Sequence, residues 1–194
     1  MMRMSKQATG TRLMRTQRGF TLLEVMISIV VLTIGLISLC GLFGLAVSAT
    51  QTAQQDMIAK QLANEAVESL FTARNSSQLL WSSIQNVSNG GIFLDGFQNI
   101  NLAGGDGIIG TADDSAAGPQ MLNEPGPDGI MNTADDIHLS LANYQRQIQI
   151  NPLFNADGSL NASLRQLVIT VQYNTPQGTT PKTYTVASYI SEYH

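Results

Sequence analysis

The pattern of apolar and polar positions divides the chain into three stretches of different character. The first is an almost continuous apolar run over residues 25–49, and no residue from Val25 to Gln55 carries a charge. An α-helix needs about 20 apolar residues to cross a bilayer. The run therefore predicts a membrane-spanning helix over residues 20–48.

The second stretch, residues 49–74, is amphipathic with the period of a helix. Its apolar residues form one stripe, consisting of Ile58, Ala59, Leu62, Ala63, Ala66, Val67, Leu70 and Phe71. Asp56 and Lys60 are spaced for an i,i+4 ion pair on a helix. The pattern predicts one continuous helix from about residue 20 to about residue 74, whose second half packs on a globular domain.

The third stretch, residues 144–194, alternates with the period of a β-strand. Leu167, Ile169, Val171 and Tyr173 share one face, and residues 182–191 repeat the pattern after a turn at 174–181. With a further strand at 144–150, these segments predict an antiparallel sheet that covers the amphipathic helix. The expected fold class is α+β.

Residues 75–143 read as a connecting region rich in loop residues, although 92–94 are compatible with a short strand. An internal repeat stands out in this region. The sequence DGIIGTADD beginning at Asp106 recurs 22 residues later as DGIMNTADD beginning at Asp128, with seven of nine positions identical. A repeated loop sequence predicts two copies of one local structure.

The acids of this repeat are candidate calcium ligands. Calcium prefers six to eight oxygen ligands, including carboxylates. The spacing is not that of an EF-hand, because glycine follows the first Asp directly and no Glu closes the loop. Two interpretations stay open, calcium loops and Asp-Gly turns with solvated acids. The candidate ligands are Asp106, Asp113, Asp114, Asp128, Asp135 and Asp136.

The segment before the apolar run carries both positive charge and an unusual acid. Five of the ten basic residues lie there: Arg3, Lys6, Arg12, Arg15 and Arg18. The positive-inside bias then places the N-terminus in the cytoplasm and the remainder across the membrane. Glu24 stands at the edge of the run, where a carboxylate is costly unless it is paired, which makes it a functional candidate.

Gly19-Phe20-Thr21-Leu22-Leu23-Glu24 resembles the type III prepilin signal of type IV pilins and of type II secretion pseudopilins. The continuation over residues 30–37, VVLTIGLI, resembles the PilV group of minor pilins. The resemblance covers about the first third of the chain. It implies the type IV pilin fold, a long helix packed on an antiparallel β-meander.

The resemblance also implies roles for individual residues. A prepilin peptidase and methyltransferase would remove residues 1–19 by cleaving between Gly19 and Phe20, and would N-methylate Phe20. Glu24 would pair with the α-amino group of Phe20 on a neighbouring subunit. The leader is longer than usual, so the start could be Met1, Met2, Met4 or Met14.

Composition narrows the function classes. Removing residues 1–19 leaves five basic residues against fourteen acids, a net charge of −9, which disfavours nucleic acid as a partner. Cys40 is the only cysteine, so no intrachain disulfide can form. His138 and His194 have no accompanying nucleophile or phosphate-loop pattern, and Trp81 is expected in the core. We expect a protein that is not an enzyme.

The leading hypothesis is a minor pilin that helps to prime or modify assembly of a type IV pilus, with twitching motility as the associated process. Its partners would be other major and minor pilins. It would reside in the bacterial inner membrane with a periplasmic C-terminal domain, and then in the surface pilus. The alternatives are a pseudopilin of a type II secretion system and a tip-displayed, calcium-dependent adhesion module.

Overall fold

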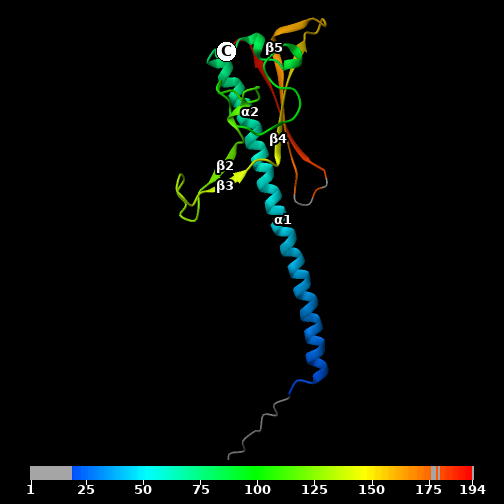
Figure 1. The fold of residues 1–194 in the computed structure, drawn as a ribbon. Coiled ribbons are helices and arrows are strands. Elements are labelled where there is room, and N and C mark those ends of the chain that lie inside the picture. Colours follow the sequence, from blue (N-terminus) through cyan, green and yellow to red (C-terminus); the bar gives the residue numbers. More distant parts are fainter. Residues whose placement is uncertain (1–18, 176–177, 179, 194) are drawn as a thin grey trace, which may run out of the picture. The chain divides into compact units, whose positions relative to one another are not determined.

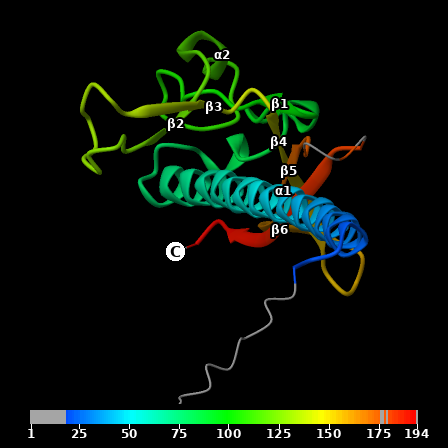
Figure 2. The ribbon, with the colours of Figure 1, turned by 90° about the horizontal axis from the view of Figure 1, so that it is seen from below.

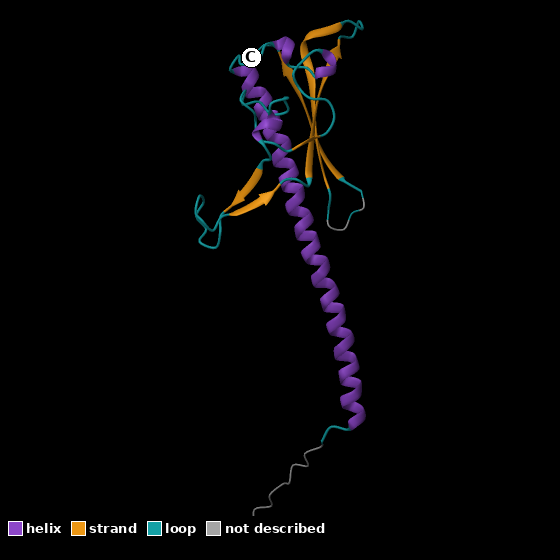
Figure 3. Cartoon of the chain, viewed as in Figure 1, coloured by secondary structure: helices purple, strands orange, loops and turns teal. Residues whose placement is uncertain are grey.

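The computed structural model describes residues 19–175, 178 and 180–193 (Figure 1). The predictions for the basic leader, the start codon and His194 fall outside these residues. The chain divides into two compact units, Met1–Ala46 and Val47–His194. The structure is α+β, with a long N-terminal helix followed by antiparallel sheet, as the sequence predicts (Figure 3).

Helix α1 spans Leu22–Asn75 without interruption, a length of about 80 Å at 1.5 Å per residue. Thr21 caps its start, because the Thr21 Oγ1 accepts a hydrogen bond from the Glu24 backbone N–H at 3.2 Å. Three hydroxyl groups within the apolar half each donate to the carbonyl four residues earlier; they belong to Ser28, Thr33 and Ser38. The predicted continuous helix is confirmed.

In the second unit, α1 buries the stripe that its periodicity predicts. Six of its residues there are buried and apolar: Ala59, Leu62, Ala63, Ala66, Leu70 and Ala73. Ile58, Val67 and Phe71 are partly buried against the same core. Four of these six residues are alanine, whose short side chains allow other segments to pack closely on this face.

The main sheet has the strand order β1-β4-β5-β6, and all of its pairings are antiparallel. Its strands are β1 Gln98–Asn99, β4 Tyr144–Phe154, β5 Leu160–Tyr173 and β6 Lys182–Ser191. The three long strands confirm the predicted meander, although β4 extends beyond residue 150 and β5 begins earlier than Leu167. A register shift between Pro152 and Leu153 accompanies the extension of β4.

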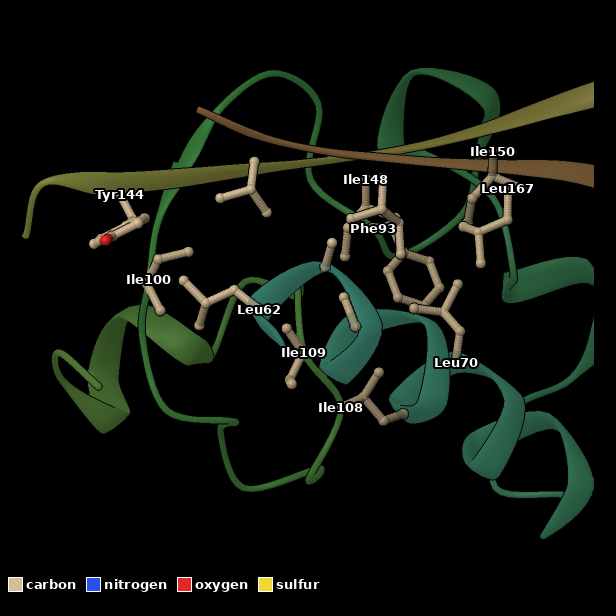
Figure 4. Close-up of a cluster of buried hydrophobic side chains, with 14 of the residues drawn as sticks. Leu62, Leu70, Phe93, Ile100, Ile108, Ile109, Tyr144, Ile148, Ile150 and Leu167 are labelled. Atoms are coloured by element: carbon tan, nitrogen blue, oxygen red, sulfur yellow. The ribbon is translucent and has the colours of Figure 1, made fainter. Parts of the chain in front are cut away.

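The predicted inward face of the sheet is the face that is buried. Leu167, Ile169 and Val171 are fully buried, and Tyr173 is nearly so. Tyr144 of β4 stacks on Tyr173, with ring centroids 5.5 Å apart. These side chains and those of α1 form one hydrophobic cluster, shown in Figure 4.

The connecting region is more ordered than its sequence suggests. It contains two 3₁₀ turns, η1 Trp81–Ser83 and η2 Val87–Asn89, a short helix α2 Asp114–Ala117, and a hairpin of β2 Met121–Glu124 with β3 Ile137–Ser140. Residues 92–94 do not form a strand, because only a single bridge joins Phe93 to Asn86. The sequence analysis did not predict this hairpin or the short helix, because their segments are rich in polar and loop-forming residues.

Several residues of the connecting region belong to the core. Phe93, Ile84 and Ile108 are buried, and Figure 4 shows Ile108 beside Leu70 of α1. Asn86 ties this region to the sheet, since its Nδ2 donates to the Ile148 carbonyl at 2.8 Å and its Oδ1 accepts from the Ile150 N–H at 2.8 Å. Trp81, expected in the core, is only partly buried at its edge, where its Nε1 donates to the Ala162 carbonyl at 2.6 Å.

The ion pair suggested by the spacing of Asp56 and Lys60 is not the one that the structure forms. Asp56 instead accepts a hydrogen bond from the Tyr173 hydroxyl and lies 3.7 Å from the Lys182 ammonium. Partners on the sheet replace the partner on the same helix. The arrangement is consistent with a type IV pilin fold.

Candidate functional site

The motif that predicts processing lies at the exposed start of α1. Gly19, Phe20, Thr21 and Glu24 line one open hollow. Phe20 is 81% exposed, and a Cβ added at Gly19 would meet no atom within 4 Å. Gly19 and Phe20 are therefore both accessible, and nothing within the described residues requires glycine at position 19.

Glu24 takes part in the N-terminal cap of α1 through its backbone, while its side chain remains available for a partner. Together, Thr21 and Glu24 have the spacing of a capping box, in which a Thr at the N-cap is followed three residues later by Glu. Only the bond from the Glu24 N–H to the Thr21 hydroxyl forms. The Glu24 carboxylate is exposed and forms no ion pair within the described residues, so it is free to bind a cation from another molecule.

The apolar side chains that follow Glu24 on α1 are exposed, because no described residue packs against them. The most apolar 18-residue window of α1 has a mean hydropathy of 2.6, and none of that window is buried. Leu36, Ile37 and Leu45 are examples, each more than half exposed. By length and composition α1 can cross a membrane, which agrees with the prediction for residues 20–48.

The duplicated loops, residues 104–114 and 126–136, adopt the same local structure. In both copies the glycine that directly follows the first Asp has positive φ, +69° at Gly107 and +70° at Gly129. Each copy begins with a glycine, Gly104 or Gly126, at which a Cβ would overlap the acid nine residues later. The repeat in sequence is therefore a repeat in structure.

The same hydrogen bonds recur in both loops. The Thr111 hydroxyl donates to Asp113 at 2.7 Å, and the Thr133 hydroxyl donates to Asp135 at 2.7 Å. The backbone N–H four residues before the last acid donates to it at 2.6 Å in each copy, on Asp114 and on Asp136. These carboxylates organise the loops whether or not an ion binds.

The Thr hydroxyl and backbone N–H groups stabilise the ionised form of one acid in each loop. The Thr111 hydroxyl holds the pKa of Asp113 below its usual value, with a further contribution from the Asp106 N–H. The Thr133 hydroxyl likewise lowers the pKa of Asp135. Hydrogen bonds within the loops thus offset part of the repulsion between neighbouring carboxylates.

The two loops differ in their surroundings. The first packs on α1, and Ile108 and Ile109 are 1% and 6% exposed. Their counterparts in the second loop, Ile130 and Met131, are 60% and 45% exposed. One sequence motif thus serves as a core element in one copy and as a surface element in the other.

The candidate metal ligands also divide by loop. Asp106, Asp113 and Asp114 place one oxygen each within 4.8 Å of one another. Among the described residues the second loop forms no comparable group. His138 lies outside the second loop, exposed, with its Nδ1 2.7 Å from the Asn123 Oδ1. Calcium binding stays a prediction, and the geometry favours the first loop for it.

A buried arginine beside the first loop was not identified from the sequence, in which Arg146 reads as one of several scattered cations. Arg146 is 5% exposed and donates to the Leu62 carbonyl of α1 at 3.1 Å. Burial lowers its pKa, while the negative charges of Glu65 and Asp114 oppose that shift. The sequence did contain a signal for this burial, because Arg146 lies two residues after Tyr144 and therefore on the same, inward face of β4.

Comparison with known families identifies the N-terminal segment. The family model described as the prokaryotic N-terminal methylation motif matches residues 14–39. Comparisons with curated proteins and with solved structures found no match. The matched motif and the long apolar helix support a type IV pilin-like protein. The motif implies membrane anchoring before assembly, processing by a prepilin peptidase and assembly with other pilins.

Proposed function

We propose that this protein is a minor pilin that helps to prime or modify assembly of a type IV pilus. The observation that carries the proposal is the prepilin motif at Gly19–Glu24 heading an unpacked apolar helix. Such a helix needs a bilayer and then a helical bundle to cover it. The second unit, Val47–His194, which we call the head, carries no disulfide and owes its stability to its core. This suits a subunit that works by packing.

Processing would convert the membrane precursor into an assembly subunit. A peptidase that reads Gly19 would cut the exposed bond to Phe20, and methylation of the new Phe20 amine would follow. Thr21 would then be the second residue, and its cap on α1 would keep the helix formed to its end. The positive-inside bias supports a cytoplasmic start and a periplasmic head.

In the bundle, Glu24 would pair with the Phe20 amine of a neighbouring subunit. An unpaired carboxylate costs several kcal/mol in an apolar surround, and the pairing removes that cost only when two subunits are in one axial register. The exposed Glu24 side chain is available for this contact. The acid would therefore set the register of assembly.

The second candidate is a pseudopilin of a type II secretion system, since the matched motif serves both classes equally well. The third candidate is a calcium-dependent adhesion module, and of it we retain only calcium binding at the first loop. The proximity of the Asp106, Asp113 and Asp114 carboxylates supports this binding. Adhesion and twitching motility remain hypotheses from the sequence. Deletion of the gene separates the first two candidates: loss of surface pili supports a pilin, and loss of protein secretion with normal pili supports a pseudopilin.

The assembly role is tested by the filament content of Glu24→Ala. We expect the variant in the membrane at the wild-type level but strongly depleted from sheared filaments, because its bundle lacks the paired charge. Ser28→Ala is the matched control, since Ser28 is a polar residue one turn away that bonds only its own helix. Equal incorporation of Glu24→Ala and wild type would contradict the proposal.

A further inference from the structure

The second duplicated loop presents an acidic and apolar tip that no described residue of its own chain covers. We propose that this tip docks on a basic groove of a second copy of the same chain. The groove lies beside α1 and is lined by Met57, Lys60, Lys182 and Tyr184, among others. This inference rests on the proposed function, since it describes a contact between heads of subunits that assemble side by side.

The first loop shows what the motif does when a surface is available. On the same backbone, Ile108 and Ile109 pack against α1 of their own chain, and the Ile109 N–H donates to the Ser69 hydroxyl at 3.2 Å (Figure 4). The second loop holds Ile130 and Met131 at the corresponding positions, exposed. The motif is therefore built to carry an apolar pair onto a helix.

One substitution between the copies defines which face of the second loop can dock. Gly110 of the first loop lies against Ile148, so that a Cβ there would clash. Asn132 replaces it in the second loop, at φ +65°. The second loop has thus lost the close approach at this point but has kept the apolar pair, which assigns the docking contact to Ile130 and Met131.

The charges of the tip and of the groove are complementary. The hairpin carries Glu124, Asp128, Asp135 and Asp136, none of which forms an ion pair in the described part of the chain. The basic side chains of the second unit divide into two kinds. Three arginines donate to backbone carbonyls inside the head, namely Arg74, Arg146 and Arg165.

The other two basic side chains, Lys60 and Lys182, are exposed, and both line the groove. Asp56 neutralises part of this charge through its 3.7 Å contact with Lys182, and Lys60 forms no ion pair in the described residues. Met57 lies beside them at 63% exposure and supplies an apolar surface. An acidic and apolar tip is the counterpart that this groove fits.

The tip and the groove lie on different sides of α1, so one chain cannot join its own pair. Glu124 at the base of the hairpin contacts Gln54, and Asp56 in the groove lies two residues on, about 200° around the helix. Figures 1 and 2 agree that β2 and β3 project away from α1 on the side opposite β6. Two different surfaces of this kind join copies head to tail, which generates an open filament when the rotation between successive copies does not close into a ring.

The test is site-specific cross-linking of the full chain in assembling cells. In a Cys40→Ser background, differently tagged copies carry Ile130→Cys or Met57→Cys, and we expect a disulfide-linked heterodimer from this combination. Leu160→Cys replaces Ile130→Cys in the control, since Leu160 is similarly exposed, at 57%, at the start of β5. Equal yields with the control, or a link from Ile130→Cys only to a different protein, would overturn the proposed partner.

Charge substitution in the groove provides a second readout. Lys60→Glu should lower the heterodimer yield about two- to fivefold, the range for loss of an exposed ion pair, and Lys60→Arg should preserve it. An unchanged yield with Lys60→Glu would contradict the electrostatic part of the contact. Filament incorporation that depends on Glu24 is measured in parallel, so a failed link in normally assembled filaments rejects the docking contact and leaves the proposed function intact.

Discussion

Arg146 and Glu65 join the sheet to the long helix, with the Arg146 Nη1 3.5 Å from the Glu65 Oε2. The two side chains differ in environment, since Arg146 is 5% exposed and Glu65 is 38% exposed. The same guanidinium nitrogen also donates to the Leu62 carbonyl. A buried charge thus holds the packing of β4 on α1, and its partner keeps contact with water.

Replacing Arg146 should destabilise the head much more than replacing Glu65. Arg146→Met removes donors to a charged group and to a buried carbonyl, and we expect a loss of about 1.5–3 kcal/mol in the free energy of unfolding. Glu65→Gln keeps a neutral acceptor at a wetter position and should cost less than about 1 kcal/mol. Urea unfolding of residues 47–194 measures both, and equal losses would contradict the asymmetry.

Processing should leave N-methylated Phe20 as the first residue of the mature protein. Gly19→Val should block cleavage, because a side chain would enter a site read as glycine, while nothing in the described chain resists the substitution. Mass spectrometry of the membrane and filament fractions measures the terminus. An intact leader in the wild-type protein, or efficient cleavage of Gly19→Val, would contradict the processing hypothesis.

The head should lose stability at alkaline pH through Tyr173. Burial raises the pKa of Tyr173, and the hydrogen bond to Asp56 and its charge raise it further. The neutral hydroxyl is therefore favoured in the folded state, so its contribution is complete below the unfolded pKa of about 10 and is lost as the pH rises above that value.

Melting temperatures of residues 47–194 across this alkaline range measure the effect. Tyr173→Phe should flatten the loss of stability, because no proton remains to be released at that position. Tyr189→Phe is the control, since Tyr189 is 58% exposed and should leave the wild-type profile unchanged. Identical profiles for Tyr173→Phe and wild type would show that the hydroxyl is not the responsible group.

Calcium should stabilise the head through the first duplicated loop. Binding to the folded state alone raises stability by about 2.7 kcal/mol at a hundredfold excess over the dissociation constant. Asp106→Asn should abolish the calcium-dependent rise in melting temperature, and Asp128→Asn should preserve it, because only the first loop gathers three carboxylates. If neither millimolar calcium nor a chelator changes the melting temperature, the calcium prediction is contradicted and the acids serve only to form the turns.

Local pattern was sufficient for the helix and the long strands, because their periods are written directly into the sequence. The apolar run, the stripe from Ile58 to Phe71 and the alternation from Leu167 to Tyr173 each specify an element and its buried face. The prepilin motif at Gly19–Glu24 is contiguous, so the sequence alone locates it. The repeat also predicts two similar loops without any tertiary information.

Only the tertiary structure decided how these parts are used. Asp56 binds Tyr173 and Lys182 in preference to the neighbouring Lys60, because packing brings the sheet to that side of the helix. Arg146 is buried because its strand position faces α1, whatever its charge. The two loops share sequence and backbone conformation yet differ in burial. Burial depends on which surface the fold places against each loop, and the sequence of the loop itself does not specify that surface.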